Sequence, residues 1–123
     1  MELNWDTTYI DPQNIIGISR GDESRMIKYL NQFLELMPPR IENLKERLQA
    51  DDRKMIRQIL HQMSPQLQFF GIPGVLTPIR RLEHEYDTMP LAELKALVND
   101  LLQKLDGASQ EVTLVLKNNF GKE

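Results

Sequence analysis

The sequence predicts an all-α protein, an antiparallel four-helix bundle with a short extra helix near its amino-terminal end. Apolar residues recur at alternating intervals of three and four through residues 27–48 and again through residues 94–115. This spacing is typical of long helices with one buried face. Two shorter apolar-periodic segments lie between them, and no segment shows the period of two that indicates a strand. Because the connections are short, neighbouring helices are expected to run antiparallel.

The composition is that of one globular domain, which we assign to residues 1–123 with residues 1–10 as an arm. The chain has no cysteine, which excludes disulfides and thiolate metal sites. Its net charge of −3, with both signs interspersed, argues against a nucleic-acid partner. No apolar run approaches the roughly 20 residues of a membrane span, and the first residues lack the layout of a signal peptide. We therefore expect a cytoplasmic monomer with no membrane partner.

The amino-terminal residues are expected to form an arm followed by one short helix. Residues 1–10 include Trp5 and show no clear periodicity, and we expect them to pack on the bundle. Asp11 and Pro12 suit the N-cap and the first position of a helix that ends before Gly21.

The first long helix is predicted to begin after Asp22, which suits its N-cap. The three–four spacing of apolar residues continues unbroken across Pro38 and Pro39, so the sequence predicts one helix kinked at these prolines. Its expected inward residues are Ile27, Leu30, Leu34, Met37, Ile41, Leu44 and Leu48.

The next helix, for which Asp51 and Asp52 are expected to form the turn and the cap, presents a histidine on its polar side. At about 100° per residue, His61 points roughly 150° away from the centre of the apolar sector. Pro65 has no N–H to donate to the carbonyl of His61, so we expect the helix to bend or loosen there. Gly71 suits the C-cap. The apolar sector contains Ile56, Ile59, Leu60, Met63, Leu67 and Phe70.

Two further helices complete the predicted bundle. Pro73 and Pro78 blur the start of the third, and residues 88–90 restart the chain into a long final helix. Gly107 lies inside that final helix and costs about 1 kcal/mol relative to alanine, which the flanking periodicity should override. The expected inward residues of the third helix are Val75, Ile79, Leu82 and Tyr86.

Exposure alone would make His61 an ordinary surface histidine, but imidazole chemistry suits phosphoryl transfer. An imidazole is mostly unprotonated at cytoplasmic pH, and one ring nitrogen can attack a phosphoryl group in line when its approach is open. The sequence shows no nucleophile–base pair, glycine-rich phosphate loop or metal cluster. His84, between Glu83 and Glu85, matches no metal-ligand spacing and is expected to be a solvated surface residue.

The order of these features resembles a histidine-containing phosphotransfer (HPt) domain, the intermediate carrier of bacterial multi-step phosphorelays in two-component signal transduction. Residues 21–52 resemble that family's lead-in, with a Gly-Asp start, a long helix with proline midway and an acidic turn. His61 then stands on the following helix, and Gly71 follows at the tenth position, as in family members. At the third and fourth positions this chain has Ser64 and Pro65, where lysine and a small residue are usual.

The resemblance spans roughly residues 11–116 and implies a function. His61 would carry phosphohistidine, accepting the phosphoryl group from an aspartate of a response-regulator receiver domain and passing it on. A hybrid histidine kinase is a further candidate partner. The chain would be a phosphocarrier rather than an enzyme, with no cofactor of its own, because the metal ion is expected on the receiver domain. The residues expected near the phosphate or the docked partner are Arg57, Ser64, Pro65, Gln68 and Gly71.

The departure at Ser64 leaves the source of positive charge open. In family members the lysine at this position lies near the phosphoryl oxygens, whereas serine donates a hydrogen bond without charge. Arg57, one turn before His61, is the nearest cation on the same ridge. Arg80 or Arg81 of the next helix is a further candidate.

Two other interpretations also stay open. The chain could be a non-phosphorylated helical module that docks receiver domains, an interpretation that the serine at the lysine position favours. It could also be a helical scaffold or dimerisation domain unrelated to signalling.

Overall fold

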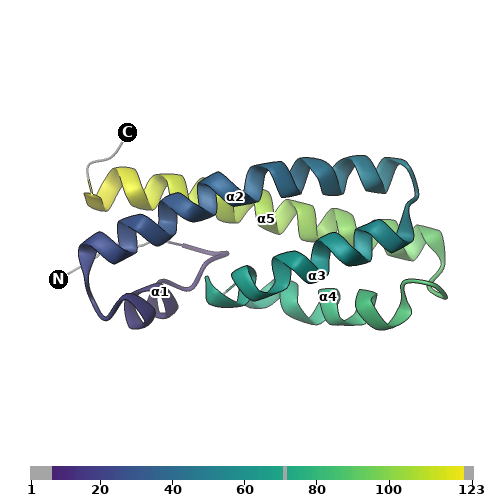
Figure 1. Cartoon of the computed structure of the whole chain (residues 1–123), viewed down its shortest axis with the longest axis horizontal. Helices are drawn as coiled ribbons and strands as arrows, with labels where there is room; N and C mark the ends of the chain where they lie inside the picture. Colours follow the sequence, from purple (N-terminus) through teal and green to yellow (C-terminus); the bar gives the residue numbers. More distant parts are fainter. Residues whose placement is uncertain (1–6, 71, 121–123) are drawn as a thin grey trace.

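The computed structural model describes residues 7–70 and 72–120, and these residues form five α-helices without a strand. The helices are α1 (Pro12–Ser19), α2 (Glu23–Gln49), α3 (Arg53–Phe69), α4 (Pro73–Glu85) and α5 (Leu91–Phe120). Figure 1 shows α2 to α5 extending along the long axis, with α1 at one end. The structure confirms the predicted all-α bundle of four helices with a short additional helix.

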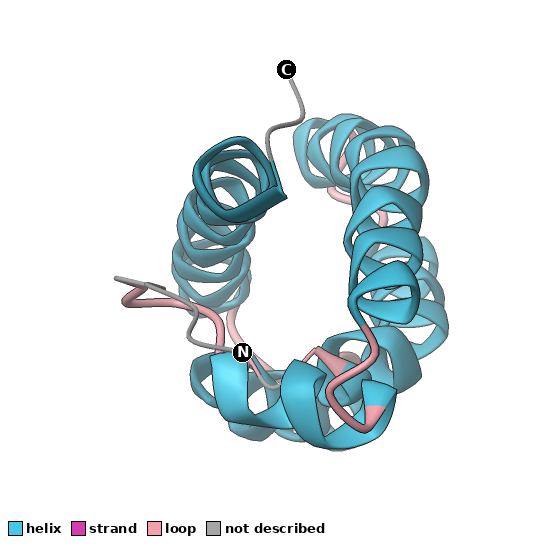
Figure 2. Cartoon of the chain, turned by 90° about the vertical axis from the view of Figure 1, so that its left-hand side faces the viewer, coloured by secondary structure: helices cyan, strands magenta, loops and turns pink. Residues whose placement is uncertain are grey.

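The four longer helices form a ring that follows their order along the chain. α2 packs against both α3 and α5, and α4 packs against the same two helices, so the first and last members of the bundle are neighbours. Figure 2 shows the helices around a common interior. The short helix α1 packs against α2. Each pair of consecutive long helices is therefore adjacent in space as well as in sequence.

Aspartate side chains cap three of the helices, as the sequence predicts. Asp11, Asp22 and Asp52 precede α1, α2 and α3, and each accepts a hydrogen bond from a backbone N–H of the first turn. These bonds satisfy donors that have no partner inside a helix. Gly21, between α1 and α2, has a φ of +73°, which glycine adopts without strain. The starts of these helices therefore follow from local sequence.

The prolines lie inside helices that continue through them. Pro38 and Pro39 fall within α2, which remains one helix and bends along its length in Figure 1. Pro65 falls within α3, which continues past it and ends with Phe70 as the C-cap residue. Gly71, predicted to be that cap, lies outside the described residues.

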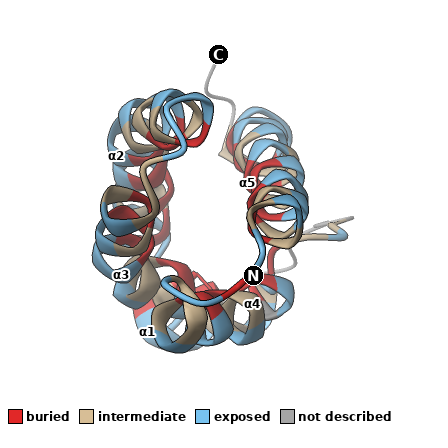
Figure 3. Cartoon of the chain, turned by 90° about the vertical axis from the view of Figure 1, so that its right-hand side faces the viewer, coloured by how far each residue is buried: buried red, intermediate tan, exposed pale blue. Residues whose placement is uncertain are grey.

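The apolar faces of the helices meet in one core. Figure 3 shows buried residues on the inner sides of the ring and exposed residues on the outer sides. In α2, Met26 and Phe33 are buried where the spacing predicted Ile27 and Leu34, which are half-buried against the core. Each buried residue is adjacent in sequence to the predicted one and both are apolar, so the spacing of apolar residues did not indicate which of the two is buried.

All the helices described between residues 7 and 120 lack the combined length and hydropathy that a bilayer span requires.

The described part of the amino-terminal arm, residues 7–10, packs on α5, and one carboxylate holds it there. Glu111 accepts hydrogen bonds from the backbone N–H groups of Thr8, Tyr9 and Ile10, at 2.5, 2.8 and 3.0 Å. The ring of Tyr9 covers Gly107 so closely that a Cβ atom there would collide with it. Gly107 therefore makes room for the arm. Trp5, the other aromatic residue expected to pack there, lies outside the described residues.

Candidate functional site

His61 lies on the outer surface of α3, where the helical spacing predicts it. Leu60 and Met63, its neighbours on the same helix, are fully buried, so the backbone directs the imidazole to the opposite side. The His61 side chain keeps 68% of its surface accessible. A group on another molecule can therefore reach the imidazole without any rearrangement of the bundle.

The imidazole of His61 contacts a carboxylate on the neighbouring helix. Nδ1 lies 2.8 Å from Oε1 of Glu83, which is a hydrogen-bond distance. The Glu83 side chain is only 23% accessible, so the carboxylate is more enclosed than the ring that it contacts. Sequence reasoning missed this pair. The sequence shows only that His61 and Glu83 lie eleven positions before and after Ile72, the N-cap residue of α4, which places them at a similar distance from the turn between α3 and α4.

The contact with Glu83 selects one form of the imidazole. A carboxylate that is ionised can only accept, so Nδ1 of His61 carries the proton and donates it. In the neutral ring the lone pair is then on Nε2. The two residues together present an oriented nucleophilic nitrogen to solvent, which an isolated surface histidine would not do.

Arg57 turns toward α4 and packs between the helices. Its guanidinium carbon lies 5.3 Å from the ring centroid of Tyr86, within the range of a cation–π contact. The side chain is half-buried, and its Nε atom is buried without a hydrogen-bond partner. The cation that is nearest to His61 along α3 is thus engaged with an aromatic ring.

Ser64, Pro65 and Gln68 follow His61 on α3 and are the remaining described residues of the predicted ridge. Ser64 is half-buried, whereas Pro65 and Gln68 are exposed. Gln66 instead faces α2, where its side chain accepts a hydrogen bond from Arg40. The described residues that follow His61 on α3 therefore supply no positive charge.

The two arginines of α4 have different surroundings. Arg81 forms ion pairs with Glu85 and with Glu93 of α5, and the hydrogen bond to Glu93 raises the pKa of the Arg81 guanidinium above its ordinary value. Arg80 is exposed and has no ion-pair partner in the described part of the chain. It lies one turn before Glu83, and residues three apart on a helix are neighbours. Arg80 is therefore the arginine of α4 that is available to a group bound at the imidazole.

The second histidine and the acidic residues form no metal site. His84 is an exposed residue of α4, as predicted. Within residues 7–70 and 72–120, no group of three or more His, Asp or Glu side chains is arranged to hold a metal ion.

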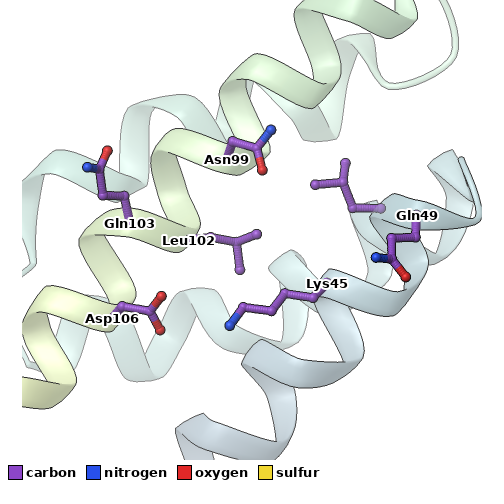
Figure 4. Close-up of a pocket in the computed structure, with 7 residues that line it drawn as sticks. Lys45, Gln49, Asn99, Leu102, Gln103 and Asp106 are labelled. Carbon is purple, nitrogen blue, oxygen red and sulfur yellow. The ribbon is translucent and has the colours of Figure 1, made fainter.

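A groove of about 440 Å³ lies between α2 and α5, on helices that do not carry the candidate site. Figure 4 shows Lys45 of α2 and both Leu102 and Asp106 of α5 along this groove. All its lining residues belong to α2 or α5. His61, on the surface formed by α3 and α4, does not line this groove.

Comparison with protein-family models, with characterised proteins and with solved structures finds no match to this chain. A functional proposal therefore depends on the resemblance of residues 11–116 and on the geometry at His61. That geometry consists of an open imidazole, a carboxylate on Nδ1 and an arginine without an ion-pair partner one turn from that carboxylate.

Proposed function

We propose that this chain is a phosphorelay carrier, in which His61 accepts a phosphoryl group from an aspartate of a receiver domain and passes it to another. The observation that carries the proposal is the contact between Nδ1 of His61 and Glu83 on an imidazole that is otherwise open. A group that fixes the proton on one ring nitrogen exposes the other as a nucleophile. The carrier acts as a monomer in the cytoplasm, where it meets its receiver domains.

The groups named above account for every atom and charge in the transfer. The lone pair of Nε2 attacks phosphorus in line, and the bond between phosphorus and the aspartyl oxygen breaks. The aspartate leaves as a carboxylate, so the leaving group needs no proton. The phosphorylated ring is positively charged, and Nδ1 keeps its proton, donating it to Glu83 in a charge-assisted hydrogen bond. The same steps in reverse deliver the phosphoryl group to a second receiver domain.

The receiver domain supplies the remaining parts of the site. It brings the phospho-aspartate, the metal ion and the carboxylates that hold that ion, so the carrier needs no cofactor. Arg80 is our candidate cation for the phosphoryl oxygens, because Ser64 is uncharged and Arg57 is engaged with an aromatic ring. The carrier is modified by one transfer and restored by the next, and it has no independent enzymatic turnover.

A receiver-docking module that holds no phosphate is the second candidate. The observation in its favour is Ser64, which stands where HPt domains usually have lysine. In this case receiver domains would bind the surface around His61 without modifying it.

Incubation with phosphorylated receiver domains tests the carrier function. We expect phosphate on the chain that is labile in acid and stable in alkali, as phosphohistidine is, and none on His61→Gln. Exposed substitutions usually change stability by under about 0.5 kcal/mol, so this variant should unfold like the wild type. His84→Gln is the matched control and should be labelled normally. Label retained on His61→Gln, or no label on the wild type from any receiver domain of the source organism, would contradict the proposal.

A further inference from the structure

His61 lies within a long stretch of sequence that carries no charged residue. All 15 lysines and arginines and all 18 aspartates and glutamates lie outside residues 58–79. At the average density of the chain, a stretch of this length would hold about six charges. His61 is the one titratable side chain within it.

Burial does not explain the missing charges. Exposed positions of amphipathic helices are where charged residues normally concentrate. Six of the described residues in this stretch other than His61 are exposed, and we call them the neutral face. They are Gln58, Gln62, Pro65 and Gln68 on α3, and Gly74 and Thr77 on α4.

In the α3–α4 hairpin these residues lie on two adjacent helices, mostly between the level of the imidazole and the turn that joins the helices. The two helices pack against each other, and Figure 1 shows them side by side. The contact between His61 and Glu83 sets their register, so the second half of α3 lies beside the first half of α4. Charged residues resume on both helices on the side away from this turn, with Arg57 on α3 and with Arg80 and Glu83 on α4, so the imidazole lies at the edge of the neutral face.

We infer that the neutral face is the surface on which the receiver domain docks, and that the contact is packed and uncharged. This inference depends on the proposed function, because a receiver must touch the surface around His61 to deliver its phosphoryl group. A charged side chain of the partner that is buried against an uncharged surface loses its water without gaining an opposite charge, and this weakens binding. The neutral face is therefore expected to favour a partner surface that is also uncharged. Glutamine side chains add donors and acceptors that can pair with the partner's backbone and polar groups.

The neutral face also suits what the receiver domain brings to the imidazole. Its phosphoryl group and metal-binding carboxylates are negatively charged. Acidic side chains on the neutral face, in addition to the half-buried Glu83, would repel these groups, and several lysines would compete with Arg80 for the phosphoryl oxygens. The affinity is therefore expected to depend only weakly on ionic strength, unlike that of a charge-steered complex.

Opposite charges introduced at one position test the kind of contact. We would measure by calorimetry, at low and high ionic strength, the binding of beryllofluoride-activated receiver domains from the source organism to Gln68→Glu and Gln68→Lys. Both variants bury an unpaired charge in an uncharged interface, so each should weaken binding at least about tenfold. Gln103→Glu and Gln103→Lys are the matched controls, since Gln103 is exposed on α5 and lines the groove between α2 and α5.

The neutral docking surface is supported if both Gln68 variants bind the receiver domain more weakly, if both Gln103 variants bind it as the wild type does, and if ionic strength has little effect on the affinity. It is overturned if glutamate and lysine act in opposite directions, if neither has an effect, or if no receiver domain binds the wild type. It is also overturned if sedimentation shows a dimer of the wild type that both Gln68 variants dissociate, since the face would then bind a second copy.

Phosphoryl transfer measured in parallel separates this inference from the function on which it depends. Normal labelling of His61 together with unaffected Gln68 variants would reject the docking surface and keep the carrier function. Receiver binding that both Gln68 variants weaken, without any label on His61, would keep the docking surface and reject the carrier function.

Discussion

Two carboxylates join distant parts of this chain, and they differ in what they hold. Glu111 on α5 accepts hydrogen bonds from three backbone N–H groups of the amino-terminal arm, which lie more than a hundred positions earlier in the chain. Glu83 on α4 accepts one hydrogen bond from the imidazole of His61, a side chain that keeps 68% of its surface accessible. The first contact fixes a segment of backbone, whereas the second orients a single ring.

The difference lies in what replaces each carboxylate when it is removed. Two of the three N–H groups that bond Glu111 are partly buried, and a backbone donor that loses its partner in such a position destabilises the fold. His61 without Glu83 would still meet water at both ring nitrogens. We therefore expect Glu111 to contribute to stability and Glu83 to the reactivity of the imidazole.

The largest effect on stability is expected from Glu111→Ala. Removing the common acceptor leaves three N–H groups unpaired, and we expect the free energy of unfolding to fall by about 1–2 kcal/mol. Urea denaturation would measure the loss. Phosphoryl acceptance at His61 should be unchanged in conditions where the variant is folded.

Glu35→Ala provides the control for this change, because Glu35 is exposed on α2 and has no side-chain partner in the described part of the chain. Its unfolding free energy should stay within about 0.5 kcal/mol of the wild type. If Glu111→Ala behaves like Glu35→Ala, the arm is not an energetic part of the fold, and the distinction between the two carboxylates disappears.

We expect Glu83→Gln to affect the reaction of His61 rather than the stability of the fold. A glutamine oxygen accepts from Nδ1 about half as strongly as a carboxylate, and its amide can instead donate to Nδ1, which would place the proton on Nε2. We expect phosphoryl acceptance to slow about tenfold, equivalent to about 1.4 kcal/mol in the barrier. Stability should hardly change. Nitrogen NMR of the imidazole should show a larger share of the ring protonated at Nε2.

Glu85→Gln is the matched variant, since Glu85 lies on the same helix and pairs with Arg81 rather than with a histidine. Its transfer rate and imidazole spectrum should match the wild type. Equal rates in both variants would mean that the contact between His61 and Glu83 has no part in the reaction.

Local signals in the sequence were sufficient for most of the fold. The aspartate caps and the three–four spacing set the helices, and the spacing continued correctly through Pro38 and Pro39. The choice between Phe33 and Leu34 was wrong in α2, because adjacent apolar residues satisfy the same period and only packing against the other helices selects one of them.

The candidate site shows the same difference between features set within one helix and contacts made between helices. The exposure of His61 follows from its position on a single helix and was predicted correctly. Glu83, by contrast, acts across two helices, and a sequence pattern does not state how far one helix slides along its neighbour. Gly107 was similarly taken as a cost within α5, whereas the ring of Tyr9 from the distant arm occupies the space that its missing Cβ leaves. Contacts between elements, rather than within them, were the ones that required the structure.

The smallest effect, which also separates two charges on one helix, is expected from Arg80→Ala. Arg80 is exposed beside the His61–Glu83 pair, whereas Arg81 already forms ion pairs with Glu85 and with α5. A cation near the phosphoryl oxygens stabilises the phosphorylated ring, so its loss should shorten the lifetime of phosphohistidine several-fold, less than a fully buried pair would because solvent screens the charge. Arg81→Ala should leave the lifetime unchanged.

Ser64→Lys in the Arg80→Ala background then tests whether position matters or only charge. Residue 64 lies one turn from His61 on α3, so a lysine there can reach the same phosphoryl oxygens from the other helix. We expect this second substitution to restore the lifetime, measured as loss of labelled phosphate after removal of the receiver domain. Restoration would show that α4 supplies here the charge that HPt domains usually place on the histidine helix. A lifetime that neither substitution alters would show that neither residue 80 nor residue 64 contacts the phosphoryl group, and the source of positive charge would then lie on the partner.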